Sequence, residues 1–80
     1  GALMPIVDFD LRRLLAEARM TVPECSRSLR AQGVPISSAR LSLCIRGLET
    51  WNIREREAVE GFLRSVIDAE RYSAAEAISF

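Results

Sequence analysis

The chain has 80 residues, of which 49% are hydrophobic, and this length fits one domain with a single modest core. The hydrophobic content argues against disorder, and no apolar run approaches the roughly 20 residues that a membrane-spanning helix needs. The formal net charge is zero, which argues against a protein that binds polyanions in general.

The charges are unevenly distributed along the chain. Residues 12–47 contain seven arginines and two glutamates, a net charge of +5, and the rest of the chain balances this at −5. All eleven basic residues are arginine, whose planar guanidinium group suits phosphate and guanine. The asymmetry predicts a basic face on an otherwise acidic body, and such a face can bind anions.

A first helix is predicted from Phe9 or Asp10 to about Arg19, with Asp8 or Asp10 as its cap. We interpret residues 1–7, which precede it, as a tag remnant or an N-terminal arm. Apolar residues recur on one stripe of this helix at helical spacing: Leu11, Leu14, Leu15 and Ala18.

A second helix is expected to begin at Thr21. The sequence TVPE is a capping box, in which the Thr21 hydroxyl accepts from the Glu24 amide and the Glu24 side chain reaches back. Val22, Cys25 and Leu29 form the inner face of this helix. Gly33 ends it in the left-handed conformation that glycine permits.

A third helix is expected from Ser37 or Ser38 to Arg46, with Gly47 as its stop, because Pro35 keeps the preceding residue out of the helical region. Its buried side is predicted to hold Leu41, Cys44, Ile45 and Leu48. Its opposite face then carries small and basic side chains instead of the usual Glu and Lys: Ala39, Ser42, Leu43 and Arg46, with Arg40 on the flank.

A fourth helix is predicted after Asn52, where NIRE forms another capping box, and it is expected to end near Arg71. Its inner face holds Val59, Phe62, Leu63, Val66 and Ile67. Residues 73–80 are expected to form a short last helix capped by Ser73, or a tail, which serves dimerisation or begins a further region. Since no segment alternates long enough to form a strand, we predict an all-α fold: a compact bundle of four to five short helices, with a helix-turn-helix in residues 8–72.

Catalysis has little support in the sequence. The chain has no histidine and no glycine-rich phosphate loop, so neither an ordinary metal cluster nor a histidine-dependent nucleophile is expected. Cys25 and Cys44 fall among apolar positions and are interpreted as buried, reduced thiols, with a disulfide or a reactive thiol as the alternative. We therefore expect no enzyme, no metal and no cofactor, and an intracellular location.

The outer face of the third helix is suited to a nucleic-acid groove. Short hydroxyl and methyl side chains let a helix backbone approach closely, and arginines such as Arg40 and Arg46 can reach base edges or phosphates. Ala39 or Leu43 can meet a thymine methyl. The N-termini of the second and third helices, capped by Thr21 and Ser37, also favour phosphate.

The segment "LRRLLAEARMTVPECSRSL…ISSARLSLCIRGL" resembles the helix-turn-helix domain of the phage-repressor and Cro superfamily. A leucine-rich first helix, a Thr-x-x-Glu start and a Ser-x-x-x-apolar-Ser helix ending in glycine carry the resemblance, over about residues 11–63. It implies that Thr21 and the second helix contact phosphate and that Ser38, Ala39 and Ser42 read bases. The connection from Leu29 to Ser37 is longer than the usual turn by about four or five residues, so the second helix or the turn must be extended.

Two functions remain open. The first is a sequence-specific DNA-binding domain of a transcriptional regulator, a repressor of phage or mobile-element type. It binds double-stranded DNA as a possible homodimer, and it is cytoplasmic and encoded by a bacterium or a phage. The second is a protein-interaction module that keeps the helix-turn-helix scaffold and does not bind DNA. The first predicts a DNA-binding set that consists of Thr21, Arg27, Arg30, Ser37, Ser38, Ala39, Arg40, Ser42, Leu43 and Arg46.

Several of these residues also have simpler interpretations. Arg27 and Arg30 are interpreted either as a pair of solvated surface residues or as phosphate contacts. Leu43 is a lone exposed apolar residue or a protein contact. Trp51 is interpreted as a lid on the core, with an exposed interface anchor as the alternative.

Overall fold

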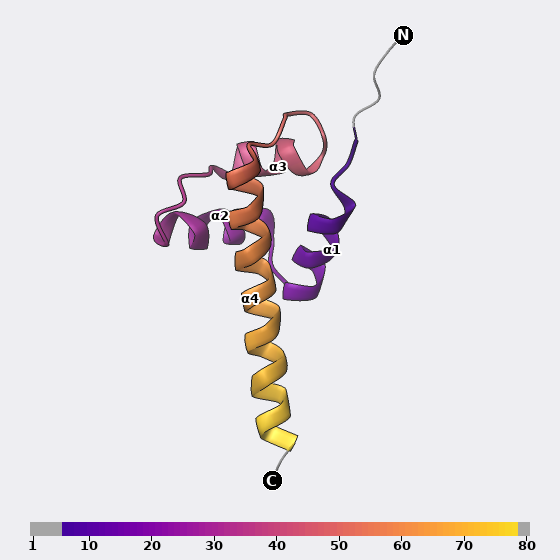
Figure 1. Cartoon of the computed structure of the whole chain (residues 1–80), viewed down its shortest axis with the longest axis vertical. Coiled ribbons are helices and arrows are strands. Elements are labelled where there is room, and N and C mark those ends of the chain that lie inside the picture. Colours follow the sequence, from indigo (N-terminus) through magenta and orange to yellow (C-terminus); the bar gives the residue numbers. More distant parts are fainter. Residues whose placement is uncertain (1–5, 79–80) are drawn as a thin grey trace.

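The computed structural model describes residues 6–78, with side chains for residues 6–74, and this part of the chain folds into four helices with no strand (Figure 1). The helices are α1 (Phe9–Ala18), α2 (Val22–Ala31), α3 (Ser38–Ile45) and α4 (Ile53–Ile78). The predicted all-α bundle is confirmed.

The helix starts follow the capping residues of the sequence. Asp8 caps α1 and accepts from the Leu11 amide, and Thr21 and Glu24 form the reciprocal capping box of α2. The Ser37 hydroxyl accepts from the Arg40 amide at the start of α3, with an O–N distance of 3.1 Å. Each cap satisfies an amide that has no partner within its helix, which is why these local signals fix the boundaries.

The core lies between two helix pairs, since α1 packs mainly on α4 and α2 mainly on α3. Burying each large aliphatic side chain stabilises the fold by about 1.5–3 kcal/mol. The buried apolar residues match the predicted inner faces: Leu11, Leu14, Leu15, Ala18, Cys25, Leu29, Leu41, Cys44, Ile45, Val59, Leu63 and Ile67. Trp51 is half-buried and packs against this core, as a lid would.

The connection between α2 and α3 is extended and anchored in the core. Residues 32–37 form it, Gly33 adopts φ +88°, and the Ile36 side chain is fully buried. The buried Ser26 hydroxyl donates to the Ile36 carbonyl at 2.7 Å. The lengthening thus falls in the turn and not in α2.

Leu48 does not join the core, and the prediction that it is buried is wrong. Its side chain is 50% exposed. Helical spacing predicts which face a residue occupies only as far as the helix continues. The helix α3 ends at Ile45, and Gly47 then turns the chain with φ +78°.

The predicted break near Arg71 and Ser73 is also wrong, because α4 is one helix of 26 residues. It is roughly 39 Å long at the usual rise per residue. No glycine or proline follows Gly61, so nothing in the backbone stops the helix before Ile78. The C-terminal part of α4 extends beyond the other helices (Figure 1), and its side chains at residues 68–74 are exposed. Within the described residues, no helix has the length and apolarity needed to cross a membrane.

Candidate nucleic-acid interface

The outer face of α3 is partly open. Ala39 and Arg46 are exposed, whereas Ser42 and Leu43 are half-buried. Arg46 stands at the C-cap of the helix, and its side chain makes no ion pair within residues 6–74. Leu41, Cys44 and Ile45 fill the inner face instead. The helix therefore presents short side chains and one unpaired guanidinium to the outside.

One side of this face borders a shallow groove of about 510 Å³. The groove lies where α3 meets the end of α1 and the beginning of α2, and we call it the basic groove. Its polar lining consists of Arg12, Thr21, Ser42 and Arg46, and its apolar lining of Leu15, Met20, Val22 and Ile45. Two guanidinium groups and two hydroxyls thus come together from three helices, and no lining residue is acidic.

Arg12 was not among the residues predicted to bind DNA. Its place on the outer face of the first helix gave it no distinguishing signal, because any exposed arginine of an amphipathic helix has the same pattern. Only the packing of α1 beside α3 brings it to Ser42 and Arg46.

Arg40 is held by carboxylates within the chain. Its guanidinium donates to both oxygens of Glu55 at 3.0 and 2.8 Å, and it lies 3.5 Å from Glu49. The hydrogen bond with Glu55 raises the pKa of Arg40, and the same bond lowers the pKa of Glu55. Arg40 thus links α3 to the start of α4, and its positive charge is compensated.

The remaining predicted residues lie on α2 or at the start of α3. Arg27 and Arg30 are exposed and make no ion pair within residues 6–74, while Ser38 is half-buried. The hydroxyls of Thr21 and Ser37 serve as helix caps. The Thr21 hydrogen bonds lower the pKa of Glu24, with a smaller contribution from Arg27.

The ion pairs divide the arginines into two groups. Arg13, Arg40, Arg56 and Arg64 each pair with at least one acid, whereas no described acid pairs with the other seven: Arg12, Arg19, Arg27, Arg30, Arg46, Arg54 and Arg71. Five of these seven lie within the segment of net charge +5, and Arg54 and Arg71 lie on α4. The local excess of positive charge is therefore available to an external anion.

Both cysteines lie inside the fold. Cys25 and Cys44 are buried and free, as predicted, and burial raises the pKa of the Cys25 thiol to about 11. Burial likewise raises the pKa of Cys44. Within the described part of the chain, no group of His, Cys, Asp or Glu residues is arranged to hold a metal ion.

No protein family, curated protein or solved structure matches this chain.

Proposed function

We propose that the chain is a sequence-specific DNA-binding domain of a transcriptional regulator, with α3 as the helix that enters the major groove. The observation that carries the proposal is the basic groove, where Arg12 and Arg46 flank the outer side of α3 without a compensating acid. The exposed short side chain of Ala39 permits close approach to base edges.

In this proposal the contacts divide by chemistry. Arg12, Arg27 and Arg30 bind phosphates, because exposed guanidinium groups on neighbouring helices can follow a DNA backbone. Ala39, Ser42 and Arg46 read bases, since an arginine can donate two hydrogen bonds to guanine and a methyl group can meet thymine. Arg40 has a structural role in our proposal, because Glu55 already accepts from it at two oxygens.

The proposal includes a regulator of phage or mobile-element type that acts as a homodimer on paired half-sites. The resemblance of residues 11–63 to repressor domains supports it. Two-fold symmetric regulators of this kind bind half-sites about one DNA turn apart, 10–10.5 base pairs between centres.

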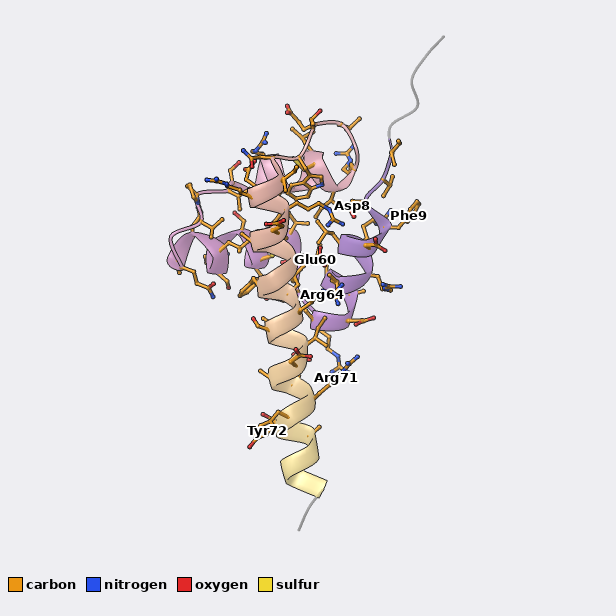
Figure 2. The ribbon with its side chains drawn as sticks, viewed as in Figure 1. Asp8, Phe9, Glu60, Arg64, Arg71 and Tyr72 are labelled. Carbon is orange, nitrogen blue, oxygen red and sulfur yellow. The ribbon has the colours of Figure 1, made fainter. Side chains whose placement is uncertain are left out.

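Selection from a pool of random duplex DNA tests the proposal. We expect the wild-type chain to enrich one short motif, repeated at a spacing of about one helical turn. The Arg46→Ala variant is expected to lose the preference at one position of the motif. Arg71→Ala is the matched control, because this exposed arginine lies on the part of α4 beyond the other helices (Figure 2). We expect this variant to enrich the same motif as the wild-type chain.

Failure of the wild-type chain to enrich any motif would contradict the proposal. It would instead favour the alternative function, a protein-interaction module on the same helical framework.

A further inference from the structure

A second groove lies on the other side of α3 from the basic groove. It has a volume of about 820 Å³. The third helix contributes Cys44 to this groove, whereas it contributes Ser42 and Arg46 to the basic groove. At about 100° per residue, position 44 points nearly opposite to positions 42 and 46. One wall is the segment Ile6–Asp10 and the other is Gly47–Trp51, so we call it the terminal groove.

The walls of the terminal groove carry exposed apolar side chains. Ile6 is 84% exposed, Phe9 70% and Leu48 50%, and all three line the groove. Phe9 points outward at the start of α1, away from α4 (Figure 2). Single exposed apolar residues are ordinary, but several gathered around one groove from separate segments mark an interaction site.

The wall Ile6–Asp10 is bonded to α3 and α4, and it meets the other wall at Gly47. The Asp8 amide donates to the Ile45 carbonyl at 2.7 Å, and Arg56 donates to both carboxylate oxygens of Asp8 at 2.9 and 3.2 Å. Gly47 lies so close to the backbone of Ile6 that a Cβ atom there would overlap it. The groove is therefore formed before any partner binds, which lowers the ordering cost of binding.

The charge of the terminal groove is acidic. Three of its lining residues are carboxylates, namely Asp8, Asp10 and Glu49, and none is basic. Both carboxylate oxygens of Asp8 accept hydrogen bonds from Arg56. The side chain of Asp10 is 75% exposed and that of Glu49 is 48% exposed. Asp10 lies 3.9 Å from Arg13, and Glu49 lies 3.5 Å from Arg40, so both ion pairs are long. Each wall thus keeps one weakly paired carboxylate.

We propose that the terminal groove binds an apolar peptide segment of another protein that carries lysine or arginine side chains. The apolar side chains of this segment pack against Phe9 and Leu48, and its cationic groups lie beside Asp10 and Glu49. The acidic walls repel nucleic acid, so DNA does not compete for the terminal groove. A peptide bound there leaves the outer face of α3 free to bind DNA.

Binding of short synthetic peptides tests the proposal, with the emission of Trp51 as the signal. Trp51 is the only tryptophan of the chain and lines the groove. We expect a leucine–lysine peptide to change the emission saturably and to shift the backbone amide signals of residues 6–10 and 47–51. A leucine–glutamate peptide and a serine–lysine peptide should have no such effect, because each lacks one half of the required chemistry.

Variants locate the binding site. Phe9→Ser and Leu48→Ser are each expected to weaken binding of the leucine–lysine peptide about tenfold or more, as loss of an apolar anchor does. The double change Asp10→Asn with Glu49→Gln should weaken it several-fold and flatten its salt dependence. Ile53→Ser is the matched control: this residue is 74% exposed, does not line the groove, and should leave the affinity unchanged.

Three outcomes would overturn the proposal. They are equal binding of the leucine–glutamate peptide, unchanged binding by Phe9→Ser, and a change of Trp51 emission with protein concentration alone. The last would mean that a second copy of the chain occupies the groove. Because no DNA is present, none of these results depends on the proposed function.

Discussion

At the residue scale, Ser26 is the only polar residue that is buried among the side chains of residues 6–74. Its hydroxyl donates to a carbonyl in the extended connection, and that carbonyl belongs to the fully buried Ile36. The bond therefore joins α2 to a segment that has no secondary structure of its own. A buried carbonyl that loses its partner costs more than the bond contributes, since water cannot replace it.

We predict that Ser26→Ala lowers the free energy of unfolding by about 1–3 kcal/mol, because the Ile36 carbonyl is left without a donor. Urea denaturation measures this change. Ser65→Ala is the control: its hydroxyl also donates to a carbonyl, that of Phe62, but it is exposed, and the change should stay within about 0.5 kcal/mol. Equal effects of the two substitutions would show that the buried bond has no special role.

Asp8 combines a helix cap with an ion pair. Burial by itself raises the pKa of Asp8, but hydrogen bonds from Arg56 and from the Leu11 amide outweigh it, and the pKa falls below its usual 3.8. A carboxylate with a lowered pKa stabilises the folded state above its unfolded-state pKa. This contribution is lost as the pH falls through the folded-state pKa.

We predict that Asp8→Asn lowers the free energy of unfolding by about 1–2 kcal/mol at neutral pH, since asparagine keeps the cap and removes the charge. The difference from the wild-type chain should shrink as the pH falls below about 4 and the wild-type carboxyl is protonated. Denaturation at a series of pH values measures it. A difference that stays constant down to pH about 2 would mean that the ion pair is not its source.

At the scale of the elements, local signals predicted more than long-range ones. Asp8, Thr21 and Ser37 cap helices through bonds to residues three positions away, so the sequence around each cap contains all the information. The inner faces were also predictable, because each helix repeats its apolar residues with its own period.

Features that depend on distant partners were not predictable. The pairing of Arg40 with Glu55 joins residues that no periodicity relates, and the burial of Ile36 depends on how the extended connection folds back. Arg12 became part of the basic groove only through the packing of α1 beside α3. Leu48 lies outside the core because α3 ends at Ile45, and Gly47 then turns the chain with its backbone close to Ile6, a residue distant in sequence.

The glycines offer a test of this backbone geometry. We predict that Gly61→Ala stabilises the chain by about 0.5–1 kcal/mol, because this exposed helical position has open space around it. Gly33→Ala should lower the free energy of unfolding by about 1–2 kcal/mol, because its φ of +88° is left-handed. Backbone strain is the whole cost at this position, since no atom lies near enough to collide with the added methyl group. Gly47→Ala should lower the free energy of unfolding more than Gly33→Ala does. Its backbone is also left-handed, and its added methyl group would in addition overlap the backbone of Ile6.

Thermal unfolding of the three glycine variants measures this order. A Gly47→Ala chain as stable as Gly33→Ala would contradict the close approach of the N-terminal segment.

Two arginines of the same helix should have separable roles. We predict that Arg40→Ala lowers the melting temperature, because it releases the contact between α3 and Glu55, whereas Arg46→Ala leaves the melting temperature nearly unchanged. The order should reverse for DNA affinity, which Arg46→Ala reduces more strongly. Calorimetry and a DNA-binding titration on the same preparations test both halves. Greater loss of DNA affinity in Arg40→Ala, after correction for the folded fraction, would reverse our assignment.

At the scale of the whole molecule, a net charge of zero conceals two chemically different sides of α3. Unpaired arginines border the basic groove, while carboxylates and exposed apolar side chains border the terminal groove. Because α1 and the residues before it lie beside α3 and the residues after it, both grooves form from residues that are distant in sequence. The fold thus creates local surfaces that the average composition does not reveal.

The salt dependence of DNA affinity tests the central claim, that the outer face of α3 and its arginines bind a duplex. We predict that the logarithm of the binding constant of the wild-type chain falls steeply and linearly with the logarithm of the salt concentration. Arg27→Ala and Arg30→Ala should each reduce the slope by about 1, as loss of one phosphate contact does, while Arg71→Ala leaves it unchanged. Binding that is absent, or that has the same slope in Arg27→Ala, Arg30→Ala and Arg71→Ala, would contradict the claim.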